Sequence, residues 1–428
     1  MEPITRKAPV LAEIAKFIAD PPTINERTMN HTRRIFADTY GVAHSGITTP
    51  AFELAMQSRQ QLFGGETIPI WGTDKKSSLL GATFYNALAV SSTDFDEGHR
   101  KAVGHPASLV VPVAENLGKY LDKPFTEVLR AIVVGYEIGT RFSFARNKDK
   151  ITTYSSGRWG GLAAAAAASV LLGLSVEKIM HALSLATILS PAMLGGASDV
   201  STGSMSKEGV AWAAQSGLQS ALLAENGFVG PYLFLDQEDE FQRNKLLDSL
   251  GENWSINSNY FKPYACCRWL HTGIKAAFEL KGENKFDPHD IEKIEIRIFD
   301  RAFKLISSKY PENPIQAQFH LPYVIACALL FDQVAPKQFT AFYLKNTTIH
   351  NLINKIKMIP DKKYTNIFPT DIPVHMSIRL PGDRVLEREV LNAPWDRNNH
   401  PDDEHLKQKF VMQVGENGET AWNEIMGR

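Results

Sequence analysis

The chain has few cysteines, and their arrangement fits neither a disulfide framework nor a zinc site. Its 428 residues contain three, Cys266, Cys267 and Cys327. The number is odd, two of the three are adjacent, and no Cys-X-X-Cys pair occurs. This composition fits a protein of a reducing compartment, so we expect a cytoplasmic location.

Long apolar runs and net charge are also missing. The N-terminal sequence MEPITRKAPVLAEIAKFIAD mixes charges into an amphipathic pattern without a continuous apolar segment, so we expect no signal peptide. The longest run of small and apolar residues, at 160–174, is too short and too rich in alanine to span a bilayer. A formal net charge of -1 provides no long-range field to attract nucleic acid or an anionic membrane. An anion-binding site must therefore be a local pocket.

Common cofactor motifs do not occur either. The sequence has no Gly-rich nucleotide-binding loop of the GxGxxG or GxxxxGK[ST] type, no HExxH and no cysteine cluster for iron and sulfur. His99 and His105 together with Asp94 are an alternative set of metal ligands, but their spacing matches no common site. We therefore expect no metal and no cofactor.

Apolar residues recur at helical spacing through the first 260 residues. This spacing predicts helices at residues 9–20, 26–42, 51–63, 108–121, 125–142, 158–172, 175–188 and 207–226. Pro106 suits the first turn of one of them, and Gly227 ends another. Six consecutive alanines, 163–168, favour a helix that its neighbours can approach closely.

The pattern changes after about Asn259. Residues 290–299 and 373–380 alternate like strands, and a turn at 381–383 precedes a third strand at 385–390. Between the strands, helices are predicted at 265–280, 316–331 and 347–356, and the chain looks helical again from His405. We therefore predict a mainly α fold with an all-helical domain, residues 1–265 and 400–428, and a smaller α+β domain, residues 266–399.

Polar residues suited to chemistry lie in five separate segments. In chain order these are 94–108, 154–160, 204–207, 261–271 and 316–323. Several stand at the starts of predicted helices, where free N–H groups bind carboxylates and phosphates. Arg158, Lys207, Lys262 and Arg268 add cationic groups. The combination indicates a pocket for a small di- or tricarboxylate.

Each of these residues also has a purely structural interpretation. Asp94 and Asp96 are equally compatible with solvated loop acids or helix caps. Lys207 is unfavourable at the start of a helix and needs an anionic partner, which Glu208 could provide. Tyrosines and adjacent cysteines are more often packing residues than reactive ones. Spacing along the sequence does not show that the five segments converge.

Six stretches, taken in order, match one known family. They are DFDEGH with HPAS, GLAAAAAASVLLGLS, MSKEGVAWAAQSGLQSALLAENGFVGP, KPYACCRWLH, QAQFHLPY and NHPDDEHLKQKF. Together they resemble the MmgE/PrpD family, which includes 2-methylcitrate dehydratase, cis-aconitate decarboxylase and iminodisuccinate epimerase. The resemblance runs along nearly the whole chain. It implies a large helical domain, a smaller α+β lid domain, a homodimer, and catalysis without a cofactor.

The resemblance also implies an active site between the two domains. The positions that match the family's motifs are Asp94, His105, Lys207, Lys262, His271 and Tyr323, with Arg268 after the cysteine pair. Dehydratases and decarboxylases of the family usually have a histidine before the alanine helix, where this chain has Tyr154. This difference favours a subgroup that resembles the epimerase, or one with another substrate, over 2-methylcitrate dehydratase or cis-aconitate decarboxylase proper.

The family's reactions share one physical difficulty, because a carbanion must develop beside a carboxylate. Preorganised cations and N–H donors have to stabilise it. We expect Lys207 and Lys262 to do so, with Tyr154 and His105 as the acid–base pair and Asp94 orienting a histidine. Substrate-binding residues are expected at His99, Arg158, Arg268, His271 and Tyr323. The alternative from another class is a non-catalytic carboxylate-binding protein on the same fold.

Overall fold

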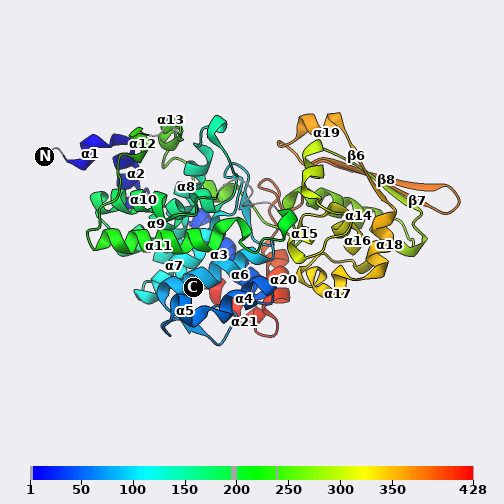
Figure 1. Ribbon diagram of the computed structural model, residues 1–428, viewed down its shortest axis with the longest axis horizontal. Coiled ribbons are helices and arrows are strands. Elements are labelled where there is room, and N and C mark those ends of the chain that lie inside the picture. The colour runs from blue at the N-terminus through cyan, green and yellow to red at the C-terminus, as the bar shows by residue number, and fades with distance from the viewer. Residues whose placement is uncertain (1–2, 194–199, 238–239, 428) are drawn as a thin grey trace.

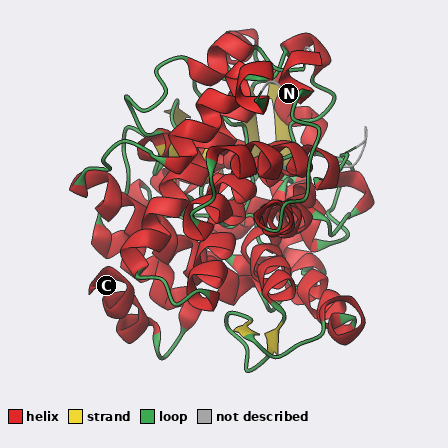
Figure 2. Cartoon of the chain, turned by 90° about the vertical axis from the view of Figure 1, so that its left-hand side faces the viewer, coloured by secondary structure: helices red, strands yellow, loops and turns green. Residues whose placement is uncertain are grey.

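The computed structural model describes residues 3–193, 200–237 and 240–427, which form two lobes side by side (Figure 1). The larger lobe is helical, and the smaller one combines a sheet with helices, which confirms the predicted mainly α fold. Figure 2 views the molecule from the side of the helical lobe, where strands are few. Within the described residues, no helix combines the length and apolarity needed to cross a bilayer.

Most helices of the larger lobe are those that the hydrophobic periodicity predicts. Its elements are α1 (Ile4–Lys7), α2 (Pro9–Ala19), α3 (Glu26–Gly46), α4 (Pro50–Gln57), α5 (Arg59–Phe63), α6 (Leu79–Ser92), α7 (Pro106–Tyr120), α8 (Phe125–Phe144), α9 (Gly157–Leu172), α10 (Val176–Leu189), α11 (Val210–Glu225), α12 (Phe234–Gln237) and α13 (Arg243–Leu247). Two short antiparallel pairs join β1 (Ile68–Pro69) with β2 (Lys76–Ser77) and β3 (Gly98–His99) with β4 (Asn259–Tyr260). The single helix predicted at 51–63 is divided into α4 and α5 at Ser58.

The alanine-rich helix α9 lies at the centre of this lobe. All six alanines of 163–168 are fully buried, and α9 packs against α8 and α11. A Cβ atom added to Gly135 of α8 would lie 2.7 Å from the Cβ of Ala167, and one added to Gly217 of α11 would lie 2.4 Å from the carbonyl oxygen of Gly161. Small residues on all three helices therefore set how closely the helices approach, as the alanine run predicts.

Two predicted helices begin later than the periodicity indicates and a third is divided, and each difference concerns a segment with candidate site residues. Residues Lys207–Gly209 form a 3-10 turn before α11, and a second such turn, Arg268–Leu270, precedes α14 (His271–Glu283). The helix predicted at 316–331 is divided into α15 (Pro314–Gln318) and α16 (Leu321–Phe331), because the His320 side chain caps α16 by accepting a hydrogen bond from the backbone N–H of Tyr323. Lys207 and His271 therefore stand at bends in the chain.

The smaller lobe is built on a four-stranded sheet of order β6-β5-β7-β8. Its strands are β5 (Lys293–Ile298), β6 (Ile356–Pro360), β7 (Val374–Leu380) and β8 (Arg384–Val390), and its remaining helices are α17 (Ala341–Leu344), α18 (Thr347–Asn354) and α19 (Lys362–Ile367). Strand β5 pairs parallel to β6 and antiparallel to β7. Ile294, Ile296 and Ile298 all point into the core, as their alternation predicts.

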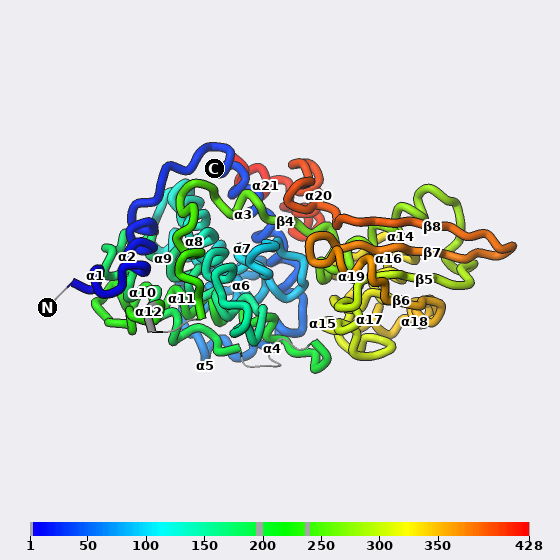
Figure 3. The backbone as a smooth tube through the Cα atoms, turned by 90° about the horizontal axis from the view of Figure 1, so that it is seen from above, coloured from blue at the N-terminus to red at the C-terminus, as the bar shows by residue number. Residues whose placement is uncertain are grey.

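The end of the chain returns to the helical lobe. Helix α20 (Asp403–Val414) lies beside α3, and α21 (Gly418–Gly427) follows it, as seen from above in Figure 3. A buried ion pair joins α20 to α3, with Nζ of Lys409 2.6 Å from a carboxylate oxygen of Asp38. The same ammonium donates to the carbonyl of Phe95 at 2.8 Å. The division of the chain at residues 265 and 399 stays a prediction.

Candidate active site

The loop between α6 and α7 brings three acids and a histidine into the interior. Asp94, Asp96, Glu97 and His105 are all at least nine-tenths buried, although the segment is highly polar. Asp94 has a φ of 50°, which turns the chain sharply directly after α6. Helix α7 then begins at Pro106, with His105 at its N-cap position.

Two lysines from distant segments meet at Asp94. Nζ of Lys207 lies 2.8 Å from Oδ1 of Asp94, and Nζ of Lys262 lies 3.1 Å from the same oxygen. Lys262 also donates to the backbone carbonyl of Asp94 at 2.8 Å. Burial opposes the ionisation of Asp94, but the two ammonium groups outweigh it and lower the pKa of the carboxyl group. Asp94, Lys207 and Lys262 thus form a buried cluster of one negative and two positive charges, which we call the ionic centre.

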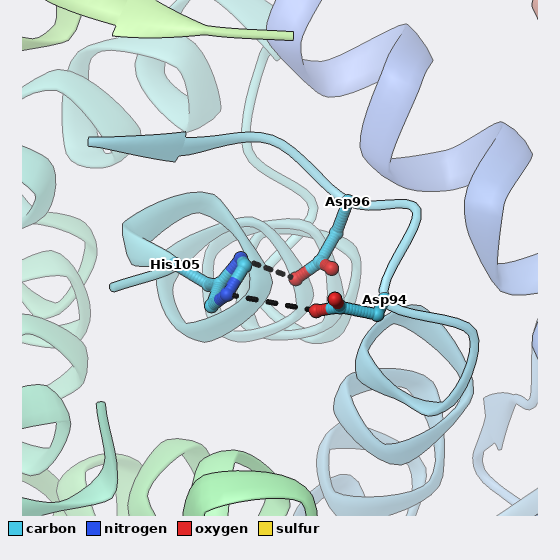
Figure 4. Close-up of side chains that lie close together, drawn as sticks. All are labelled: Asp94, Asp96 and His105. Atoms are coloured by element: carbon cyan, nitrogen blue, oxygen red, sulfur yellow. Dashed lines mark ion pairs between the residues drawn. The ribbon is translucent and has the colours of Figure 1, made fainter. Parts of the chain in front are cut away.

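His105 lies between two carboxylates of this loop (Figure 4). Its Nδ1 is 2.8 Å from the carbonyl oxygen of Glu97 and 3.2 Å from Oδ2 of Asp96, and its Nε2 is 3.9 Å from Oδ1 of Asp94. A carbonyl only accepts, so Nδ1 carries a proton. Burial alone would lower the pKa of His105, but Asp96 outweighs it and raises the pKa to about 9. His105 is therefore an imidazolium at neutral pH.

His271 has the opposite character. Its Nε2 donates to the carbonyl of Cys266 at 3.1 Å, which leaves Nδ1 as an unprotonated acceptor. This Nδ1 is buried and has no hydrogen-bond partner among the residues that the structure describes. Burial, together with the positive charge of Lys262, lowers the pKa of His271 to about 3. The site thus contains one charged and one neutral histidine.

Three cationic groups gather at the ionic centre. Lys207, Lys262 and the imidazolium of His105 are held by the carboxylates of Asp94 and Asp96, with Glu208 farther out on Ser156. Clustered cations in a buried place attract an anion. Oxygen and nitrogen atoms of Asp94, Asp96 and His105 lie within 4.8 Å of one another, a spacing open to a metal ion. However, Asp94 already contacts two ammonium groups, which would repel a divalent cation, so these residues do not fit a metal site.

Four of the predicted site residues, Asp94, His105, Lys207 and Lys262, meet at the ionic centre, whereas Tyr154 and Arg158 lie elsewhere. Tyr154 is 47% exposed, with its ring 5.7 Å from the guanidinium of Arg146. Arg158 forms an ion pair with Glu240 at 2.9 Å and lines a cavity of about 240 Å³ together with Arg146. Neither side chain contacts the ionic centre. It is Ser156, between them in the sequence, that faces inward, where its hydroxyl donates to Glu208 and accepts from the backbone N–H of His105.

The remaining predicted binding residues have partners within the protein. Arg268 forms an ion pair with Asp396 at 2.5 Å and stacks on Tyr260 at 4.6 Å. The hydroxyl of Tyr323 donates to the carbonyl of Gln338 at 2.5 Å inside the smaller lobe. His99 accepts from the backbone N–H of Ala102, and burial lowers its pKa to about 3.

Two acids that the sequence analysis did not assign to the site belong to it. Asp96, for which a loop acid or a helix cap was an equal alternative, holds Nδ1 of His105 and accepts a hydrogen bond from Ser108. Glu97 accepts from the N–H of Ala107 and from the hydroxyl of Tyr136, each at 2.8 Å, and burial raises its pKa to about 7. The only signal for Asp96 and Glu97 in the sequence is the density of acids in 94–97. Three carboxylates so close together need partners if the segment is buried.

Fold and site together define a class of protein: a mainly α chain with a smaller α+β unit, whose buried polar centre is built from side chains of several distant segments. Comparison with known families identifies the class. The chain matches the MmgE/PrpD N-terminal domain over residues 12–248 and the MmgE/PrpD C-terminal domain over residues 264–422, and it belongs to this family.

Three relatives are distant in sequence but cover most of the chain. Cis-aconitate decarboxylase of Homo sapiens is 27% identical over 358 residues, 78% of this chain and 73% of the relative. The mouse (Mus musculus) protein of the same name is 25% identical over 90% of this chain and 82% of its own length. A probable 2-methylcitrate dehydratase of Saccharomyces cerevisiae is 23% identical over 83% of this chain and 74% of its own length.

Proposed function

We propose that the chain is an enzyme that forms a carbanion next to a carboxylate of a small di- or tricarboxylate, using side chains alone. The observation that carries the proposal is the buried centre in which three cationic groups, Lys207, Lys262 and His105, meet around Asp94. The names of the relatives support the substrate class, since cis-aconitate and 2-methylcitrate are tricarboxylates.

In this proposal the lysines stabilise the developing charge. When a proton or CO2 leaves the carbon beside a carboxylate, the electron pair spreads onto the carboxylate oxygens. Lys207 and Lys262 lie fixed by Asp94 before the substrate arrives, so little reorganisation is needed during the reaction. Asp94 holds both ammonium groups in one place and prevents their mutual repulsion from driving them apart.

We assign the proton transfers to the two histidines. Nδ1 of His271 is a free acceptor and takes the proton from carbon once the carboxylates of a bound substrate raise its pKa from the low value that burial imposes, and the imidazolium of His105 supplies the proton that completes the reaction. This replaces the expected pair of Tyr154 and His105, because Tyr154 is half exposed and apart from the centre. In an epimerase His105 gives a proton back to carbon, and in a dehydratase it protonates the leaving hydroxyl. In a decarboxylase CO2 leaves in place of the proton, so His271 takes no proton and only His105 acts, by protonating the carbon.

Proton exchange in D2O tests the proposal and separates these reactions. The protein is incubated with a panel of citrate-like, aconitate-like and aspartate-derived acids and followed by NMR. Deuterium uptake without loss of a group indicates an epimerase, loss of the hydroxyl a dehydratase, and release of CO2 a decarboxylase. Binding of an acid without any exchange or conversion would overturn the proposal in favour of a carboxylate-binding protein.

Between the catalytic alternatives, we favour proton transfer without loss of a group, as in an epimerase. The support is Tyr154, which stands where dehydratases and decarboxylases of the family usually have a histidine. The relatives' names support the second candidate, a lyase acting as a dehydratase or decarboxylase. We further propose that the protein is cytoplasmic and forms a homodimer. Size-exclusion chromatography with light scattering would test the dimer, and fluorescence microscopy of a tagged chain its location.

A further inference from the structure

The backbone that carries Lys207 has an unfavourable conformation. Three consecutive residues have positive φ angles: 39° at Lys207, 58° at Glu208 and 70° at Gly209. Only glycine adopts this region at no steric cost, so the two preceding residues need compensating contacts. The turn aims the Lys207 side chain at Asp94, which α6 and its following loop provide from a distant part of the sequence.

The compensating contacts come from the side chain of Glu208. One carboxylate oxygen, Oε2, accepts hydrogen bonds from both the backbone N–H and the hydroxyl of Ser156, at 2.9 and 2.8 Å. The hydroxyl oxygen of Ser156 in turn accepts from the backbone N–H of His105 at 3.1 Å. A continuous path of hydrogen bonds therefore connects the turn of Lys207 with the residue that begins α7.

The three segments on this path are also in direct contact. A Cβ atom added to Gly157 would lie 2.5 Å from the carbonyl oxygen of Glu208, and one added to Gly104 would lie 2.4 Å from the hydroxyl oxygen of Ser156. Nothing larger than glycine fits at either place without movement. The distance between the Lys207 turn and His105 is thus set by backbone contact and by one carboxylate.

We propose that Glu208 is a positioning residue which, through Ser156, fixes Lys207 relative to His105. The inference rests on the proposed function, since it assigns Glu208 a role in arranging the two groups that act on the substrate. The carboxylate also adds negative charge near His105, alongside Asp94 and Asp96, whereas Lys262 opposes them. Geometry and charge are therefore two separable contributions of the same side chain.

Four variants separate these contributions. In Glu208→Ala the path is broken, and we expect kcat to fall about 30- to 100-fold with KM changed less than about threefold, because small displacements of catalytic groups cost this much. Ser156→Ala should lower kcat in the same direction. The double variant should lose no more than Glu208→Ala alone, since both substitutions interrupt one path.

Glu208→Gln provides the rescue. Its amide oxygen can accept both hydrogen bonds of Ser156, so kcat should return to within about fivefold of the wild type. The charge is absent, however, and the upper limb of the pH profile should move down by about half a pH unit. A matched control is Glu137→Gln, because Glu137 is a buried carboxylate whose partners are Arg141 at 2.6 Å and the N–H of Ser255 at 2.7 Å, outside the path from Glu208 to His105. That variant should leave the pH profile in place.

Histidine NMR of the free full-length protein keeps this inference separate from the proposed function. With histidine labelled, the amide and ring signals of His105 should shift in Glu208→Ala and Ser156→Ala but stay near wild type in Glu137→Gln. If the wild type converts no acid, the proposed function fails while the NMR still tests the path. Unchanged His105 signals, additive losses in the double variant, or a kcat within twofold in Glu208→Ala would each overturn the inference.

Discussion

Replacing Lys207 by methionine separates catalysis from folding. Methionine keeps the length and apolar contacts of the lysine stem but removes the ammonium that lies 2.8 Å from Asp94. Asp94 stays paired, because Lys262 donates to both its carboxylate and its backbone carbonyl. The variant should therefore fold, and we expect a loss of about 1–2 kcal/mol in the free energy of unfolding, less than for a carboxylate left alone.

The effect on turnover should be much larger. A unit charge about 4 Å from a developing negative charge contributes up to about 4 kcal/mol at the effective dielectric constant of a partly polar interior. Removing one preorganised donor of this kind costs about 2.7–4 kcal/mol, or 10²- to 10³-fold in kcat. The reason lies in the structure, which holds the ammonium in place before any substrate binds.

The assay is the rate of deuterium exchange into the substrate in D2O, measured beside the melting temperature. Lys281→Met serves as the matched control, because Lys281 also contacts a carboxylate and a carbonyl, Asp332 and Leu329 at 2.8 and 2.7 Å, but in the smaller lobe. The control should exchange at the wild-type rate. If folded Lys207→Met keeps more than a tenth of wild-type exchange, the assigned role of this lysine is wrong.

Further predictions concern pH, the expected tyrosine base and helix packing. The pKa of His105 is raised from 6.5 to about 9, so turnover that needs the imidazolium should fall as pH rises through about 9. The same charge also stabilises the fold; this contribution is complete below about pH 6.5 and is lost as pH rises through about 9. A pH–rate profile compared with His105→Gln checks this, and a profile flat to pH 10 would contradict it. Tyr154→Phe should keep exchange within about threefold, since the ring lies outside the ionic centre; a hundredfold loss would restore tyrosine as the base. Gly217→Val should lower the free energy of unfolding by about 3 kcal/mol in a denaturant titration, because even its first added carbon would lie 2.4 Å from the carbonyl of Gly161; an unchanged midpoint would mean that α9 and α11 separate easily.

The elements that local rules govern were predictable. The helical spacing of apolar residues, the six alanines and the alternation of Ile294, Ile296 and Ile298 each describe a single segment, and the structure has them as helices and a strand. The family resemblance rests on short motifs, and the matched family domains confirm it. These features depend on neighbours within a few positions, which is what a sequence displays.

Where helices begin was less predictable, and the candidate site depends on it. The periodicity extends the helix of α11 back to Lys207, but the hydrogen bonds of Glu208 to Ser156 favour a turn with positive φ there. The partner lies 52 positions away, so no local pattern indicates the turn. The same holds for Asp96, whose partners His105 and Ser108 become neighbours only when the loop folds onto α7.

By itself the sequence determined the mainly α fold, the family and the residue types available for a polycarboxylate. It could not decide which of those residues face each other. Tertiary structure brings Asp94, His105, Lys207 and Lys262 together and leaves Tyr154 and Arg158 beside Arg146 and Glu240. The physical reason is that the charge state of a buried group is a property of its surroundings: His105 is charged and His271 neutral because of the groups packed against each, not because of their order in the chain.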